Sequence, residues 1–527
     1  MNTPGERSVA RAATSMGAAT AASRALGFVR VLVVAAVLGT TYLGNTFQAS
    51  NSVSNVLFEL IAAGALSEVL VPTFVGLLDR DEGEEAQRLA GGVLGVALVV
   101  LGVVTVVGVV AAPWLARLLS SGNANASVAS EQRALSTFLL RFFVPQVMLY
   151  ALGAIAIAVL YAKRRFVITA VAPIGNTVVM VAALVAFWAV HGGSGTGLDL
   201  TTPEKLLLAA AGTLGVAAFV AIPVVGLHRS GFRLRPHLPR RDPAVSRLLR
   251  LSGWTVMQNA GEGLLLGAAI VLGNRVAGGV VAYQVAFVFF LAPYAVLAQP
   301  IHTAILPELS KDAHDRPDAF NASLRWGLDN MAALVVPCAA ALVVFALPGM
   351  RVVAFGHAST EGGVALLAAA LASLALGLYA YGAFFLFTNA FYALGDSRTP
   401  AVVGIGGAVI GVVVMAALVP FTHGAALVAA LGIGHSAAYG LASVTLALLL
   451  ARRTGHLVVP RALPRIAAVT AVIGAAVWVL ERAIEPSGRG ATLAMLLVLG
   501  LAAAGAYLGA LRLLGVRRRR LEAAVGS

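Results

Sequence analysis

Apolar runs of roughly 20 residues recur along the whole chain and are separated by short polar segments. Folded as a helix, a run of that length crosses a hydrocarbon core about 30 Å thick. The alternation expected of barrel strands is absent. The pattern predicts an all-α polytopic membrane protein with about fourteen transmembrane helices. The predicted spans lie near residues 16–39, 45–77, 89–118, 135–162, 166–190, 204–227, 248–274, 279–308, 324–350, 362–394, 400–420, 424–451, 463–484 and 490–515.

Composition supports this class. Of 527 residues, 59% are hydrophobic and 11% are charged, whereas soluble domains are about a quarter charged.

No cleavable signal peptide is evident, so residues 16–39 are expected to remain as the first span. The single cysteine, Cys338, excludes an intrachain disulfide, and we expect it to be a small buried hydrophobe.

The basic residues predict the orientation. With both termini in the cytoplasm, the cytoplasmic segments hold about 26 Arg and Lys and the opposite side about seven. We therefore attribute the net charge of +14 to topology and to contact with anionic lipid headgroups. The expected location is the cell membrane, crossed many times, and nucleic acid is not an expected partner.

Four sequence landmarks recur at a nearly constant offset. The repeated pairs are Val37-Leu38-Gly39 with Val271-Leu272-Gly273, Val71-Pro72 with Leu306-Pro307, Ala112-Pro113 with Leu347-Pro348, and Tyr161-Ala162 with Tyr392-Ala393. A repeat of six spans keeps the same membrane orientation, and substrates of such proteins bind between the two halves.

The repeat predicts the domain organisation. We expect a first lobe at residues 1–228 (spans 1–6), a basic cytoplasmic linker at 229–247 and a second lobe at 248–455 (spans 7–12). Residues 456–527 would then form the last two spans and a basic cytoplasmic tail.

Two arginines, Arg24 and Arg30, lie in the first predicted span. A guanidinium at the centre of a membrane helix costs roughly 2.5–3.5 kcal/mol on insertion scales. The cost is offset by a water-filled cavity, a carboxylate or an anionic ligand, which makes the pair a candidate anion site. Arg24 could instead extend its side chain to the cytoplasmic surface, whereas Arg30 is too central for that.

Two polar residues of the second predicted span extend this candidate site. If the first two spans form a hairpin around residues 40–45, Glu59 lies level with Arg24 and Asn55 with Arg30. Glu59 either pairs with Arg24 or contacts a ligand or ion directly.

Glu262 lies in the middle of the seventh predicted span. It is a candidate for binding a coupling cation or proton, since a buried Glu can have a raised pKa, or for a hydrogen bond within the bundle. His302 and His435 are expected to be core histidines, with proton coupling as the alternative. No metal site, cofactor site or catalytic constellation is predicted, and no ATP site is present. The pattern indicates a transporter rather than an enzyme.

Several segments resemble the MurJ/MviN family, the lipid II flippases of the multidrug/oligosaccharidyl-lipid/polysaccharide exporter superfamily. The resemblance covers about residues 15–515. Its most specific segments are residues 23–30 (SRALGFVR), 64–72 (GALSEVLVP), 303–310 (TAILPELS) and 391–400 (FYALGDSRTP).

The resemblance implies a function and a site. It implies alternating access, with lipid II entering a cavity between two lobes from the cytoplasm and its head group released outside. Arg24 and Arg30 match family arginines that are expected to meet the diphosphate.

The chain departs from the best-known family pattern at three places. It has Asn45 where relatives carry an Asp, Phe58-Glu59 where they carry an arginine pair, and Val288 where they carry a cavity arginine. These segments look closer to actinobacterial members. The candidate substrate-binding residues are Arg24, Arg30, Asn45, Asn55, Glu59 and Gln284.

The lead hypothesis is a lipid II flippase that supports peptidoglycan synthesis. The alternatives are a flippase for another polyprenyl-diphosphate-linked glycan, a cation-coupled small-molecule exporter and a non-transporting scaffold of the cell-wall machinery. The expected partners are the lipid-linked substrate and the bilayer, with cell-wall synthesis proteins as further candidates.

Overall fold

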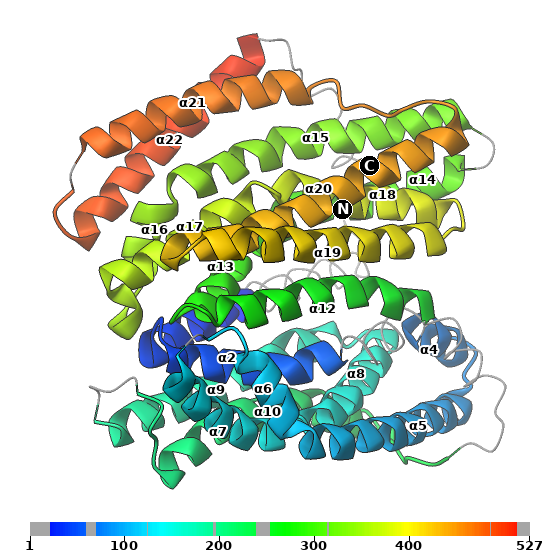
Figure 1. Cartoon of the computed structure of the whole chain (residues 1–527). Coiled ribbons are helices and arrows are strands. Elements are labelled where there is room, and N and C mark those ends of the chain that lie inside the picture. Colours follow the sequence, from blue (N-terminus) through cyan, green and yellow to red (C-terminus); the bar gives the residue numbers. More distant parts are fainter. Residues whose placement is uncertain are drawn as a thin grey trace, which may run out of the picture. The chain divides into compact units, whose positions relative to one another are not determined.

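A computed structural model describes residues 22–58, 70–123, 125–192, 197–238, 253–313, 316–484 and 486–513. Throughout these residues the regular structure is helical, which confirms the predicted all-α class (Figure 1). Residues 22–38 form the first described helix. The others are α2 (Tyr42–Phe58), α4 (Leu70–Leu78), α5 (Gly83–Val110), α6 (Ala112–Ser120), α7 (Ala126–Phe143), α8 (Gln146–Ala162), α9 (Phe166–Val190), α10 (Thr202–Arg229), α12 (Gly253–Gly273), α13 (Gly279–Pro293), α14 (Gln299–Asp312), α15 (Pro317–Val344), α16 (Ala346–Val353), α17 (Glu361–Ala375), α18 (Leu378–Ala393), α19 (Arg398–Leu418), α20 (Gly424–Thr454), α21 (Leu463–Ala483) and α22 (Arg489–Leu513).

Each predicted span coincides with one or two of these helices. Within the described residues, ten helical segments are long and apolar enough to cross a membrane. The pair α17 and α18, bent by 43°, makes an eleventh. Part of the second predicted span lies outside the described residues, and α12 has a shorter apolar segment. The count of fourteen spans therefore stays a prediction.

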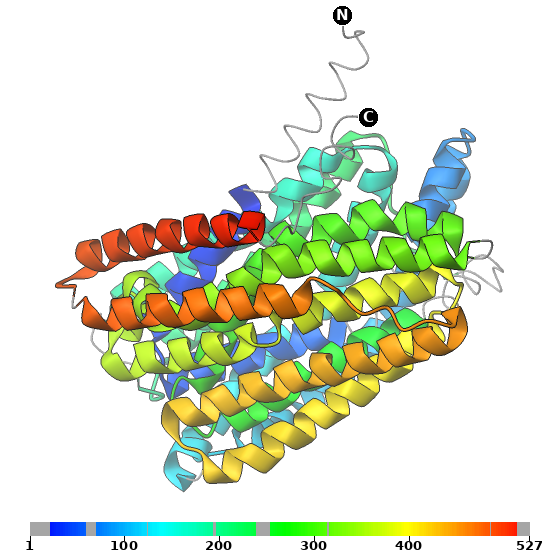
Figure 2. The same cartoon turned by 90° about the horizontal axis from the view of Figure 1, so that it is seen from above.

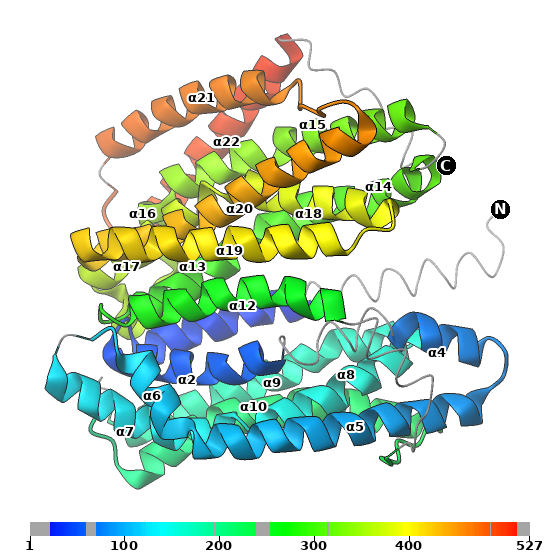
Figure 3. The ribbon, with the colours of Figure 1, turned by 45° about the vertical axis from the view of Figure 1, so that its right-hand side comes forward.

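The chain divides into two compact units. The first contains residues 1–281 and the short segment Phe355–Ala358, and the second contains the remainder. The helix α12 thus packs with the first unit, where it lies beside α2 (Figure 3). This division falls later in the chain than the expected linker at 229–247, and the lobe boundaries stay a prediction.

The helices of the two halves repeat the same local geometry. Both α5 and α15 contain 28 residues, and a single residue separates each from a short helix. At the first break, the N–H of Ala111 donates to the carbonyls of Val107 and Val109. At the second, Phe345 donates to Ala341 and Val343, each 234 positions later. A proline near the start of each short helix favours the break, because proline has no N–H to donate.

A second pair of breaks recurs after α8 and α18. Arg164 and Gly395 both have left-handed backbone, with φ of 57° and 75°. Arg165 N–H donates to the carbonyl of Leu160, and Asp396 N–H donates to that of Phe391. Each of these residues lies 231 positions from its counterpart, the offset that the sequence landmarks show there.

The core of the first unit holds the arginine-bearing helix in place. Val34 and Leu38 pack with Phe47 of α2 and with α7 in one buried cluster. Phe47 and Phe143 meet edge to face with ring centroids 5.8 Å apart. Residues 22–38 are therefore fixed to α2 and α7 by apolar burial near the turn that joins them.

The last two helices, α21 and α22, pack on α15 in the second unit (Figures 1 and 2). Ala332, Ile466 and Tyr507 form the buried centre of this contact. The Tyr507 hydroxyl donates to the carbonyl of Ala333 at 2.9 Å. These helices lie outside the predicted repeat.

The carboxylate of Asp396 fixes the start of α19. It accepts hydrogen bonds from the Thr399 N–H at 2.9 Å and the Thr399 hydroxyl at 2.6 Å, and it pairs with Arg453 at the end of α20. Burial raises the pKa of Asp396, but the Thr399 hydrogen bonds and the Arg453 charge outweigh it and hold the pKa below its ordinary value.

We predict that Asp396→Asn lowers the free energy of unfolding by about 1–2 kcal/mol at neutral pH, because a helix-capping and ion-pairing carboxylate is lost. A carboxyl with a lowered pKa stabilises the fold above its unfolded pKa, about 3.9, and this contribution is lost as the pH falls further. Thermal unfolding in detergent at several pH values should therefore show the two proteins converging below about pH 4. Asp199→Asn, at an exposed position, is the control. A pH-independent difference would contradict the prediction.

Candidate substrate site

Arg30 lies on the side of its helix that faces the interior of the first unit. Its side chain is half-buried, and Val34, one turn later, is 3% exposed. Tyr150 of α8 is an electrostatic neighbour of the guanidinium. The Tyr150 ring also contacts Phe58 of α2, with centroids 5.2 Å apart. Arg30 is thus placed where the first helix, α2 and α8 come together, and the contribution of Tyr150 was not predicted.

Arg24 lies near the start of the described helix, and its side chain is exposed. Glu59, the carboxylate expected to pair with it, lies outside the described residues. The Arg24–Glu59 pair stays a prediction. Of the two arginines, Arg30 is the more enclosed by protein.

The hairpin turns earlier than expected. The turn is at Gly39–Thr41, where Gly39 has φ of 72°, and α2 begins at Tyr42. Counting from this turn along an antiparallel pair, Arg30 is level with Ser50, and the half-buried Asn55 lies nearer the level of Arg24. The expected match of Asn55 with Arg30 assumed a turn at 40–45.

Asn45 is fully enclosed, with 0% of its surface exposed. Its Nδ2 donates to Asn274 Oδ1 at 3.1 Å and to the Val276 carbonyl at 2.8 Å. Its Oδ1 accepts from the N–H groups of Val280 at 3.0 Å and Val281 at 3.4 Å. In this conformation the amide joins α2 to the turn between α12 and α13, and its polar atoms all have protein partners.

A network of amides extends from this contact. Gln132 of α7 donates to Asn274 Oδ1 at 3.0 Å and to the Thr46 hydroxyl at 3.2 Å. Asn274 in turn donates to the carbonyl of Leu119 at 2.7 Å. Beside the network, Gly278 has φ of 80°, and a Cβ there would lie 2.4 Å from the carbonyl carbon of Thr40. Gln132 and Asn274 were missed because each lies near the end of a predicted span, where polar residues are ordinary.

A second buried amide joins three helices of the same unit. Gln146 of α8 is 0% exposed. It accepts from the Ser54 hydroxyl at 3.2 Å and donates to the Thr213 hydroxyl at 3.1 Å. These bonds join α8 to α2 on one side and to α10 on the other.

The remaining candidates are dispersed. Glu262 on α12 is half-buried and has an interaction partner, so a structural role is as well supported as ion binding. Gln284 on α13 is half-buried, has a partner and belongs to the second unit. His435 is 2% exposed, and its Nδ1 lies 3.0 Å from the Tyr283 hydroxyl. Across the described residues, no group of three or more His, Cys, Asp or Glu side chains could hold a metal ion.

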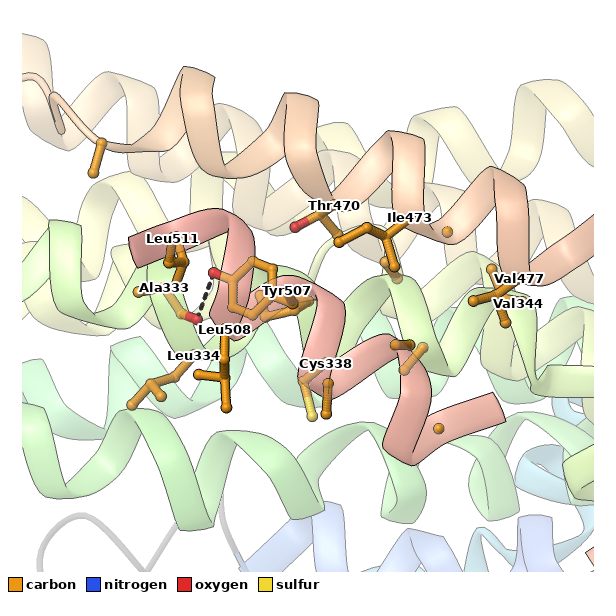
Figure 4. Close-up of a pocket in the computed structure, with 18 of the residues that line it drawn as sticks. Ala333, Leu334, Cys338, Val344, Thr470, Ile473, Val477, Tyr507, Leu508 and Leu511 are labelled. Atoms are coloured by element: carbon orange, nitrogen blue, oxygen red, sulfur yellow. Dashed lines mark hydrogen bonds between the residues drawn. The ribbon is translucent and has the colours of Figure 1, made fainter. Parts of the chain in front are cut away.

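The second unit contains an apolar cavity of about 650 Å³ between α15, α21 and α22 (Figure 4). Cys338, Ile473 and Tyr507 are among its lining residues. Asp329 also lines the cavity, and it accepts from the N–H of Ala462 at 2.9 Å. Cys338 is half-buried here, less enclosed than the buried position that we expected.

Comparison with solved structures defines the class of protein. A multidrug resistance MATE family transporter of the MOP superfamily, in an inward-facing conformation, matches with a TM-score of 0.65 and 13% identity. The match covers 82% of this chain and 94% of that one. The chain therefore shares the overall fold of that solved membrane protein.

The chain belongs to the lipid II flippase MurJ family, whose sequence profile matches residues 34–499. The probable lipid II flippase MurJ of Rhizobium tropici is 30% identical over 496 residues, covering 91% of this chain and 88% of that protein. A solved lipid II flippase MurJ in an inward closed conformation has a TM-score of 0.74 and 17% identity, covering 95% of this chain and 99% of that one. The predicted family is confirmed, and its members are transporters rather than enzymes.

We predict that Asn45→Asp lowers the free energy of unfolding by about 1–3 kcal/mol, since a carboxylate cannot donate to the two acceptors that Nδ2 now meets. Thermal unfolding of purified protein in detergent measures the effect. Asn51→Asp, at a half-buried position on the same helix, is the matched control. Equal losses in both variants would show that the amide network has no special role.

Proposed function

We propose that this chain moves lipid II, the undecaprenyl-diphosphate-linked peptidoglycan precursor, from the cytoplasmic to the outer leaflet by alternating access. The observation that carries the proposal is the family match over residues 34–499. The half-buried Arg30 within the apolar first helix supports it, because it supplies a cation to a substrate with an anionic head group.

Arg30 is the proposed primary contact for the diphosphate. Guanidinium groups bind phosphate oxygens through two parallel, charge-assisted hydrogen bonds. Tyr150 of α8 is an electrostatic neighbour of Arg30, and Gln146, one turn earlier on α8, is hydrogen-bonded to α2. This bond would help to hold the helices that surround the guanidinium. We assign Arg24 to a position nearer the cytoplasmic end of the first helix, where the head group would arrive first. Asn55 and Glu59 lie on the adjoining span.

The apolar cavity beside α21 and α22 suits part of the polyprenyl chain. Its lining is mostly aliphatic and aromatic, and burial of each methylene group of a chain gains roughly 0.8 kcal/mol.

The orientation and the energy source are also part of the proposal. The distribution of Arg and Lys supports both termini in the cytoplasm. The membrane potential is the proposed energy source, because one charge crossing 100 mV is worth about 2.3 kcal/mol. Enzymes that make or consume lipid II are the expected protein partners.

We predict that Arg30→Gln reduces lipid II translocation about tenfold or more, because a charge-assisted contact to the diphosphate is lost. Arg30→Lys should keep part of the activity, since it retains the charge but loses bidentate geometry. The measurement is complementation of a flippase-depleted strain, with lipid II exposure on the outer leaflet and membrane protein level assayed in parallel.

Arg117→Gln and Arg133→Gln remove exposed charges from other helices and serve as controls that should leave transport intact. Full complementation by the double variant Arg24→Gln and Arg30→Gln would overturn the assignment of the diphosphate site.

A further inference from the structure

The two halves of the repeat differ sharply at one matching place. After α18, Asp396 forms an ion pair with Arg453 at the end of α20. The counterparts in the first half are Arg165, 231 positions before Asp396, and Arg229, 224 positions before Arg453. The second offset is fixed by the left-handed glycines that follow α10 and α20, Gly231 with φ of 78° and Gly455 with φ of 77°.

The first half therefore has two cations where the second has a cation and a carboxylate. Arg165 and Arg229 both line one pocket of about 490 Å³ at the start of α9 and the end of α10. Both side chains are exposed. Among the described residues, no Asp or Glu lines this pocket. In the second half the Asp396 carboxylate pairs with Arg453, whereas the described residues of this pocket provide no such carboxylate.

A third cation lies beside the pocket. Lys163 donates to the carbonyl of Ser230 at 3.1 Å, and its ammonium lies 5.3 Å from the centre of the Phe232 ring. Burial and the nearby charge of Arg165 lower the pKa of Lys163. Among the described residues that line or adjoin this pocket, the charged side chains named here are therefore all cationic.

The rest of the pocket is apolar. Ile168 lies on one wall, and Ile222 and Val225 of α10 lie on the other. The two helices approach closely because Gly226 has no side chain, and a Cβ there would lie 2.7 Å from Ile168. Val225 is 47% exposed, so the apolar wall continues onto the outside of α10.

We propose that this pocket binds an anionic glycerophospholipid of the bilayer. Its phosphate would lie between Arg165 and Arg229, and an acyl chain would follow Ile222 and Val225. Basic pockets between the ends of membrane helices have this combination of charge and apolar surface. A volume of about 490 Å³ suits a phosphoglycerol group and the first methylenes. The larger sugar–peptide head group of lipid II would not fit, which favours a bilayer phospholipid over the transport substrate.

The test is native mass spectrometry of the purified full chain titrated with palmitoyl-oleoyl phosphatidylglycerol or phosphatidylcholine. We expect tighter binding of phosphatidylglycerol, and a weakening of about tenfold or more in the double variant Arg165→Gln and Arg229→Gln. The control variant, Arg452→Gln and Arg461→Gln, removes two exposed arginines from the other half and should leave that binding unchanged.

Arg165→Asp gives a second and independent arm. This substitution would place a carboxylate beside Arg229, as Asp396 lies beside Arg453 in the second half. We therefore expect it to abolish phosphatidylglycerol binding while thermal stability is kept or raised.

Three results would overturn the proposal. One is unchanged phosphatidylglycerol binding in both arginine variants. Another is displacement of the lipid by inorganic phosphate at equal concentration, which would indicate a site for free phosphate. The third is a loss of undecaprenyl diphosphate binding in the Arg165 and Arg229 variants while phosphatidylglycerol binding is unchanged, which would assign the pocket to the transport substrate.

Discussion

Burying a polar side chain without a hydrogen-bond partner among apolar helices is unfavourable in free energy, and this constraint determines how the helices of the first unit are joined. Buried amides of Asn45, Gln132 and Gln146 satisfy it through hydrogen bonds to other helices, and those bonds fix α2, α7, α8 and the α12–α13 turn within the first unit. An amide at position 45 fits because its Nδ2 meets two acceptors. The amide of Asn45 therefore has a local structural role. Of the two candidate arginines, Arg30 is the more enclosed by protein.

The internal repeat makes the unusual charges easier to interpret. The same helix breaks occur at Ala111 and Phe345, and again at Arg164 and Gly395. Because the backbone geometry matches, side chains at equivalent positions of the two halves can be compared directly. At one such position the second half has an ion pair between Asp396 and Arg453. In the first half the corresponding cations face a pocket. We thus propose anion binding at two separate places of the first unit, around Arg30 and around Arg165.

Much of the fold could be predicted from the sequence, because apolar runs of membrane length leave few alternatives to helices. The repeat was visible through sequence landmarks such as Pro113 and Pro348, which lie in the first turn of the short helices α6 and α16. The hairpin level was misjudged because the left-handed Gly39 places the turn earlier. The amide network was not predictable, since it joins Gln132 to Asn274 across 142 positions and no local pattern records such a contact.

Transport by the purified chain tests the central claim most directly. Proteoliposomes would carry labelled lipid II in one leaflet, and its arrival in the other would be followed with an impermeant quencher under an imposed membrane potential. The account predicts translocation above that of protein-free liposomes, with the rate dependent on the potential. No translocation by correctly folded protein under a potential of either sign would contradict it.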